Sequence, residues 1–128
     1  MRTLRWPRLW LGLWIMAIGV VIVLSLIAPP PMPFKPPRNF DKLEHLAAYA
    51  SLAFGAVQLF AQRRTLVFAG LGLVFLGIAL EFAQGFMVPD LRQMDMADAL
   101  ANSLGVALGM ACAATPLART LQRLEAKL

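Results

Sequence analysis

Residues 66–86 read LVFAGLGLVFLGIALEFAQGF, an apolar stretch interrupted near its end by Glu81 and Gln84. A run of about 20 apolar residues is the length that crosses the hydrocarbon core of a bilayer as a helix. An ionisable side chain in such a helix is costly, so it faces other helices or a wet cavity. The stretch therefore predicts a membrane-spanning helix with a candidate polar site near one end.

The composition of the whole chain also indicates an integral membrane protein. It has 128 residues, of which 59% are hydrophobic and 15% charged, with a mean hydropathy of +0.67. A soluble domain of this size has too much surface to bury so many apolar side chains. The net charge of +5 comes from basic residues at the ends of apolar segments, where they meet lipid headgroups. The sequence has no nucleic-acid-binding motif, and we expect no nucleic acid partner.

We expect one all-α membrane domain over residues 1–128, with four transmembrane helices and an amphipathic tail helix. The helices are predicted over about 9–28, 43–61, 66–86 and 95–114, with the tail over 116–128. A proline-rich strap over 29–37 and a loop over 87–94 join them. The first segment is interpreted as a retained helix and not as a signal peptide, because prolines follow where a cleavage site would lie.

Three local patterns refine this picture. Trp6, Trp10 and Trp14, near the start of the first helix, are expected to be anchors at the membrane interface. Gly105 and Gly109 on the fourth helix form a small-xxx-small pair, which predicts close approach of a neighbouring helix. Leucines at helical spacing in the tail predict a helix that lies in the interface.

The distribution of lysine and arginine predicts the orientation, because cytoplasmic loops carry more of them. One side would hold Arg2, Arg5, Arg8, Arg63, Arg64, Arg119, Arg123 and Lys127, and the other Lys35, Arg38, Lys42 and Arg92. Both termini are therefore predicted to be cytoplasmic. The strap and the loop over 87–94 would face outward.

Polar side chains gather at the predicted outer ends of three helices. Residues three or four apart share one face of a helix. Asp41, His45 and Tyr49 have this spacing on the second helix, Glu81 and Gln84 on the third, and Asp95, Asp98 and Asn102 on the fourth. All three sets lie near the same side of the membrane. We therefore expect a polar pocket that opens outward and does not cross the bilayer.

Helix capping explains part of this set. Asp41 with Glu44, and Asp95 with Asp98, have the spacing of capping boxes at helix starts. Glu44 is then expected on the outer surface of the cluster. Glu81 has no such explanation, because an anion near the C-terminal end of a helix opposes the helix dipole.

Four strings carry a family resemblance. They are Asp41-Lys42-Leu43-Glu44-His45, Glu81-Phe82-Ala83-Gln84, Arg92-Gln93-Met94-Asp95-Met96-Ala97-Asp98 and Asn102-Ser103-Leu104-Gly105. They are similar to the DKxxH, ExxQ, RxxDxxD and NxxG motifs of the VanZ-like family, over about residues 40–110. The resemblance implies a small multi-pass protein of the bacterial inner membrane. The namesake of the family is linked to resistance to the glycopeptide teicoplanin, but the resemblance supplies no reaction, and cofactors stay unknown.

The first functional hypothesis is an enzyme or binding protein that lies among membrane lipids and takes a lipid-linked cell-envelope precursor or a glycopeptide. His45, Glu81 and Asp98 would be catalytic, as acid–base groups. Substrate binding would fall to Asp41, Lys42, Tyr49, Gln84, Arg92, Asp95 and Asn102, with Arg92 clamping a phosphate or carboxylate. A divalent cation on the acids and His45 is an alternative. The spacing matches no recognised metal signature, however, and we predict no metal site.

Two other classes remain as alternatives. The polar residues could form a structural network, since ion-pair networks arise without any catalytic role. The chain would then be a non-catalytic scaffold or an accessory subunit. Transport is the third hypothesis, but four helices are few for a transporter and no inverted repeat is visible. Whether the chain is an enzyme is left open.

Overall fold

Within its described residues, the chain folds into four long helices and a short C-terminal one. The computed structural model describes residues 1–27, 31, 33–37, 39–87 and 94–128, and within these ranges it contains no strand. The elements are α1 (Pro7–Leu26), α2 (Phe40–Leu59), α3 (Arg63–Met87), α4 (Met96–Ala111), the 3-10 segments η1 (Cys112–Ala114) and η2 (Pro116–Arg119), and α5 (Thr120–Glu125). The all-helical prediction is confirmed, with helix ends that differ from the expected ones by a few residues.

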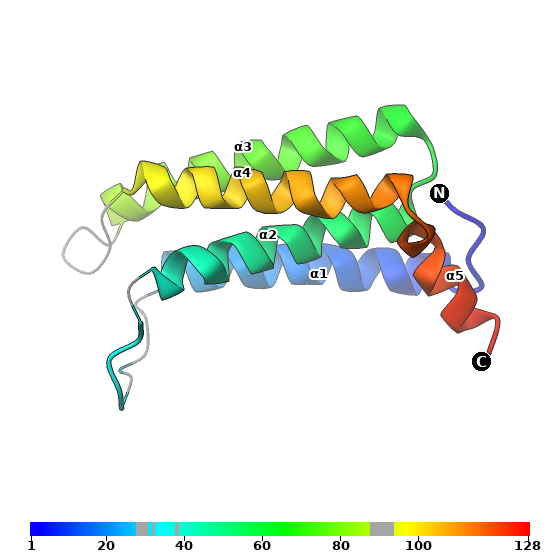
Figure 1. Cartoon of the computed structure of the whole chain (residues 1–128), viewed down its shortest axis with the longest axis horizontal. Helices are drawn as coiled ribbons and strands as arrows, with labels where there is room; N and C mark the ends of the chain where they lie inside the picture. The colour runs from blue at the N-terminus through cyan, green and yellow to red at the C-terminus, as the bar shows by residue number, and fades with distance from the viewer. Residues whose placement is uncertain (28–30, 32, 38, 88–93) are drawn as a thin grey trace.

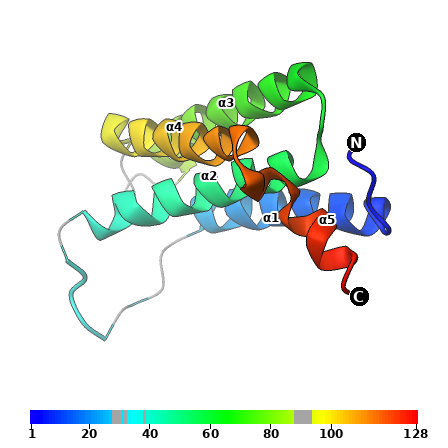
Figure 2. The same cartoon turned by 45° about the vertical axis from the view of Figure 1, so that its right-hand side comes forward.

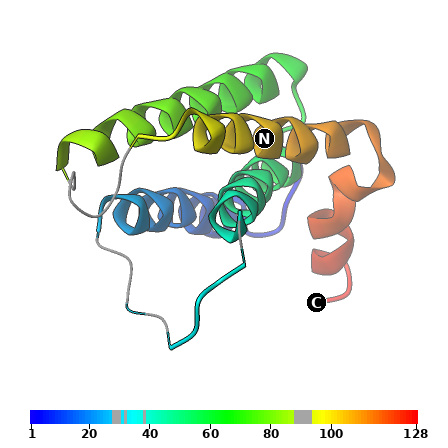
Figure 3. The ribbon, with the colours of Figure 1, turned by 60° about the vertical axis from the view of Figure 1, so that its left-hand side comes forward.

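The long helices alternate in direction and form two layers. Figures 1 and 2 show α3 and α4 together on one side of the bundle and α1 and α2 on the other. In Figure 3, α2 is seen nearly end-on while α1 crosses the view, so these two helices are inclined to each other. Both termini lie at one end of the bundle, and α2 and α4 begin at the opposite end (Figure 1).

In the part of the chain that the structure describes, three helices are long and apolar enough to cross a membrane, namely Pro7–Leu26, Arg63–Met87 and Met96–Ala114. α2 has the same length as α1, 20 residues, but carries three charged side chains in its first turns. It is the central helix of the bundle, with a continuous buried face that includes Leu52, Ala53 and Val57. No residue of α1 is buried, so α1 covers the outside of the bundle.

Glycines let α4 approach α2 closely. A Cβ atom on Gly105 would meet the carbonyl oxygen of Leu46 and the backbone nitrogen of Ala50. A Cβ atom on Gly109 would meet the carbonyl oxygen of Ala50. The predicted close contact through this small-xxx-small pair is confirmed, and it sets the spacing between the two helices that carry most of the polar residues.

Two tryptophans of α1 donate hydrogen bonds to other parts of the protein. The Nε1–H group of Trp14 donates to the carbonyl oxygen of Leu52 at 2.8 Å. The Nε1–H group of Trp10 donates to the Glu125 carboxylate at 2.6 Å. The protein itself therefore satisfies these two indole donors, and the role of Trp10 and Trp14 as interfacial anchors stays a prediction. Trp6 remains 40% exposed, and its role as an anchor stays a prediction.

The α-helix in the tail is shorter than predicted. Pro116 begins a 3-10 segment, and α5 covers only Thr120–Glu125, so a continuous helix over 116–128 is wrong. Leu117 and Leu124 are more than half exposed, and an outward apolar surface is present. Contact of this surface with a membrane stays a prediction.

Candidate functional site

α2, α3 and α4 bring His45, Glu81 and Asp98 together, and we call these residues the three-helix cluster. Glu81 Oε1 lies 3.6 Å from His45 Nδ1, and Asp98 Oδ2 lies 3.8 Å from His45 Nε2. One ligand-type atom from each residue lies within 4.8 Å of the others. Glu81 and Asp98 are buried and His45 is partly buried. The three residues predicted to be catalytic therefore share one site.

Asn102 orients the histidine ring. Its Oδ1 atom lies 2.9 Å from His45 Nδ1, and its side chain is fully buried. In the tautomer with the proton on Nδ1, the ring donates to this oxygen and Nε2 keeps its lone pair. Gly77 on α3 makes room for the arrangement, since a Cβ atom there would lie 3.0 Å from Asn102 Cβ and 3.2 Å from Tyr49 Cε1.

Lys42 ties the start of α2 to the start of α4. Its Nζ atom donates to Asp95 Oδ2 at 3.1 Å and to Asp98 Oδ1 at 3.2 Å. Asp95 also accepts from the backbone N–H of Ala97 at 2.8 Å, so its predicted capping of the fourth helix is confirmed. The Ala97 N–H and the Lys42 ammonium hold the pKa of the Asp95 carboxyl below its ordinary value. Asp95 therefore stays ionised beside the cluster.

Asp41 does not cap α2. The helix begins at Phe40, its N-cap is Asn39 with a positive φ of 66°, and no side chain bonds to that cap. The capping-box interpretation of Asp41 is wrong because the helix begins one residue before it. Asp41 lies in the first turn, 3.5 Å from Lys42 Nζ, with 58% of its side chain exposed. It stands at the rim of the site.

Two buried oxygens, Tyr49 Oη and Glu81 Oε1, have no hydrogen-bond partner in the part of the chain that the structure describes. Tyr49 is 2% exposed and Glu81 1%. The other Glu81 oxygen, Oε2, accepts from the Asp95 backbone N–H at 3.4 Å. Leaving a buried polar group unpaired costs roughly 1–3 kcal/mol. A ligand or an ordered water at the cluster would remove this cost.

Gln84 and Arg92 were both predicted to bind substrate. The Nε2–H group of Gln84 donates to the carbonyl oxygen of Ser25 at 2.8 Å, which ties α3 to α1. No hydrogen bond or ion pair among the described residues joins Gln84 to the three-helix cluster, so its contacts support a packing role. Arg92 lies outside the described residues, as does most of the loop predicted over 87–94.

A pocket of about 250 Å³ lies between α1 and α2 beside the cluster. It is lined by Val21, Leu24 and Ser25 from α1 and by Glu44, His45, Ala48 and Tyr49 from α2. Its wall is apolar on one side and polar on the other, so it suits an amphipathic ligand. Ser25 was not among the predicted residues, although a serine near the end of an apolar helix is a weak signal for such a position.

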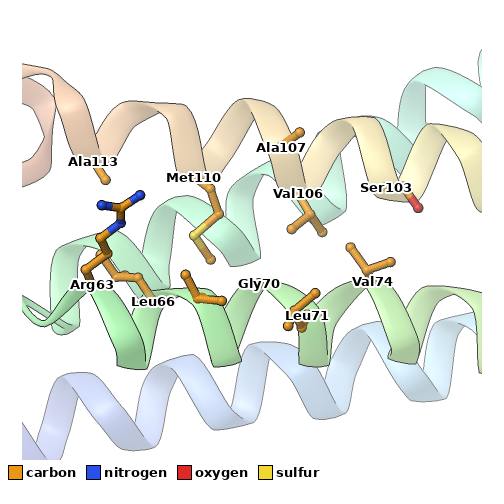
Figure 4. A pocket seen from close by; sticks show the side chains of 11 residues that line it. Arg63, Leu66, Gly70, Leu71, Val74, Ser103, Val106, Ala107, Met110 and Ala113 are labelled. Atoms are coloured by element: carbon orange, nitrogen blue, oxygen red, sulfur yellow. The ribbon is translucent and has the colours of Figure 1, made fainter.

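A larger groove, of about 370 Å³, lies between α3 and α4 (Figure 4). Leu66, Gly70, Val106 and Met110 give it an apolar lining, with Arg63 at one end. None of its lining residues is an acid or a histidine. The groove is therefore apolar, and the acid–base side chains lie at the three-helix cluster.

Glu125 forms a second buried polar contact at the other end of the bundle, which sequence reasoning missed. Its carboxylate accepts from the backbone N–H groups of Arg5 at 2.6 Å and Trp6 at 3.2 Å, and from Trp10 Nε1. Burial raises the pKa of this carboxyl, but the three donors outweigh burial and hold the pKa below its ordinary value. We call this contact the Glu125 clasp. Its only sequence signal was a single acid in an otherwise basic tail.

The candidate site thus rests on its own geometry. Acid–base side chains, a lysine and two unpaired buried oxygens meet at one end of an apolar bundle, beside an amphipathic pocket. The chain matches no family model, no curated protein and no solved structure, so the resemblance to the VanZ-like family stays a prediction from its four motifs.

Proposed function

We propose that this chain is a multi-pass protein of the bacterial inner membrane, with α2 as a fourth spanning helix and both termini in the cytoplasm. The central position and the length of α2 support the fourth span. The placement of both termini at one end of the bundle supports a common side for them (Figure 1). The excess of basic residues at that end supports the cytoplasmic side.

The three-helix cluster is proposed to bind or process a lipid-linked or phosphate-bearing compound of the cell envelope at the outer leaflet. The observation that carries this proposal is the convergence of His45, Glu81 and Asp98 beside a pocket with an apolar wall. Val21 and Leu24 on that wall suit a lipid chain, and the polar residues suit a headgroup. The four motifs shared with the VanZ-like family support a link to glycopeptide tolerance.

The cluster has the parts needed for proton transfer. His45 Nε2, the ring nitrogen that Asn102 does not hold, would accept or donate the proton. Asp98 Oδ2 would stabilise the charged ring from 3.8 Å. A positioned acid–base group of this kind contributes about 10²- to 10⁴-fold to a reaction rate.

The test is the effect of His45→Gln, Glu81→Gln and Asp98→Asn on teicoplanin tolerance in a bacterial host. Each variant is expected to lower tolerance to that of a host without the chain, because each removes one acid–base group. Glu81→Gln and Asp98→Asn also keep the side-chain shape. Ser103→Ala is the control on α4, since Ser103 bonds only to the carbonyl oxygen of Ala99. Protein level in the membrane and thermal unfolding in detergent are measured for every variant.

The same measurements separate the proposal from a non-catalytic scaffold. The contacts of Lys42 with Asp95 and Asp98 and of Gln84 with Ser25 favour a structural role for part of the polar set. If the cluster variants melt much earlier and disappear from the membrane, the residues act as a network that holds the bundle. If tolerance persists in all three variants, the site plays no part in it.

A further inference from the structure

We infer that His45, Glu81 and Asp98 bind a divalent transition cation of the Zn²⁺ or Mn²⁺ kind. The donor set is one imidazole nitrogen and two carboxylate oxygens, which come from three different helices and lie within 4.8 Å of one another. Imidazole favours transition metals, whereas Mg²⁺ and Ca²⁺ prefer oxygen ligands alone. The cluster therefore fits an ion that accepts both kinds of donor.

The distances suit a shared ion better than direct hydrogen bonds. Asp98 Oδ2 lies 3.8 Å from His45 Nε2, and Glu81 Oε1 lies 3.6 Å from the other ring nitrogen, Nδ1. Both distances are beyond the ~3.2 Å reach of a good N–H···O hydrogen bond. Two ligands at about 2.1 Å from a tetrahedral ion are about 3.4 Å apart. His45 Nε2 and Asp98 Oδ2 are within a few tenths of an ångström of that spacing.

The neighbouring contacts leave one free ligand atom on each residue. Asn102 Oδ1 lies 2.9 Å from His45 Nδ1, so Nε2 is the ring nitrogen available to an ion. Lys42 Nζ donates to Asp98 Oδ1 at 3.2 Å, so Oδ2 is the available oxygen of Asp98. The Asp95 backbone N–H holds Glu81 Oε2, which leaves Oε1. Metal ligands in proteins are usually oriented by outer hydrogen bonds of this type.

Glu81 Oε1 is the independent observation that points to a cation. It is buried and has no hydrogen-bond partner among the residues that the structure describes. A buried carboxylate is either protonated or held by a positive group. A bound cation would supply that group at closer range than the His45 ring, whose Nδ1 atom is 3.6 Å away. The pocket between α1 and α2, which His45 lines, gives an ion and its further ligands a path to the cluster.

The cation rests on the proposed function and deepens it, with one change: His45 Nε2 would bind the ion and would not transfer the proton. Lys42 contacts three acids, Asp41, Asp95 and Asp98, and Glu81 adds a fourth acid beside Asp95. The described residues of the site are therefore too acidic to attract a phosphate. A bound divalent ion would offset this charge and could coordinate a phosphate oxygen directly. The substrate class that fits the cluster is then a phosphate-bearing headgroup bound through the metal.

The test is calorimetric titration of the purified full chain in detergent with Zn²⁺ and with Mn²⁺, after treatment with a chelator. One ion per chain is expected. His45→Gln, Glu81→Gln and Asp98→Asn should each weaken binding by ~10-fold or more, since changes even to outer partners of metal ligands cost about 10- to 100-fold. Glu125→Gln, which makes the same change in a carboxylate at the opposite end of the bundle, should leave the affinity nearly unchanged. Absence of binding to the wild type, or equal weakening by Glu125→Gln, would overturn the inference.

A measurement on the wild type alone covers the case of a variant that does not fold. His45 is the only histidine in the chain, so pulsed electron paramagnetic resonance of bound Mn²⁺ should show coupling to one imidazole nitrogen. Bound Mn²⁺ without that coupling overturns the assignment. If no ion binds but Glu81→Gln still abolishes tolerance, the inferred cation site is wrong and the proposed function is kept. If the ion binds but the cluster variants keep tolerance, the proposed function is wrong and the cation site is kept.

Discussion

Gly105→Ala is expected to destabilise the folded chain by about 1–3 kcal/mol, the usual cost of an added group in a tight interface. The new Cβ would meet the carbonyl oxygen of Leu46 and the backbone nitrogen of Ala50. Backbone atoms in a packed helix cannot rotate away as a side chain does, so α2 and α4 would have to separate. Unfolding in detergent, followed by circular dichroism against temperature, measures the loss.

Gly72→Ala is the matched control for this prediction. Nothing lies within 4 Å of a Cβ at Gly72, so alanine there should be neutral or stabilise the helix by up to about 1 kcal/mol. Because α2 carries His45 and α4 carries Asp98, Gly105→Ala should also weaken any function of the cluster, whereas Gly72→Ala should not. Equal melting of the two variants would contradict the close packing of α2 on α4.

The fold could be predicted from the sequence because its main determinants are local. A long apolar run predicts a spanning helix, and two glycines four residues apart predict a close contact between helices. The helix ends were less accurate, since they depend on which backbone groups find partners. Thus α2 begins at Phe40 without a side-chain cap, and Pro116 divides the tail into a 3-10 segment and a short helix.

The candidate site was predictable as far as helical spacing allows. Spacing identifies residues on one face of a helix, and the structure brings His45, Glu81 and Asp98 together from three such faces. Helical spacing cannot show which residue of one helix contacts which residue of another. The contact of Gln84 with Ser25 depends on how α1 packs on α3, which no local pattern encodes.

The Glu125 clasp was missed for the same reason, because it joins opposite ends of the chain. In the structure, one carboxylate accepts from Arg5, Trp6 and Trp10. Nearby, the Gln58 side chain donates to the carbonyl oxygen of Leu117 and accepts from the backbone N–H of Leu121. These contacts hold the tail against the start of α1 and the end of α2. The tail is therefore part of the bundle as well as a candidate membrane surface.

Glu125→Gln is expected to lower the melting temperature at neutral pH by several degrees, the size of effect that the loss of charge-assisted hydrogen bonds produces in a small domain. The variant keeps one carbonyl acceptor but loses the second carboxylate oxygen and the negative charge. The backbone N–H groups of Arg5 and Trp6 and the Trp10 indole would then compete for a single weaker acceptor. Thermal unfolding in detergent between about pH 3 and pH 7 measures the effect.

The dependence on pH shows whether the carboxylate charge is responsible. The folded-state pKa of Glu125 lies below its ordinary value of 4.5, so the charged form is favoured by folding. Its stabilising contribution is complete above pH 4.5 and is lost as the pH falls through the lower folded-state pKa. The difference in melting temperature between the wild type and Glu125→Gln should therefore be constant near neutrality and shrink in acid. Glu44→Gln, at an exposed position, should melt with the wild type throughout. A difference for Glu125→Gln that persists unchanged at pH 3 would mean that the shape of the carboxylate, and not its charge, holds the clasp.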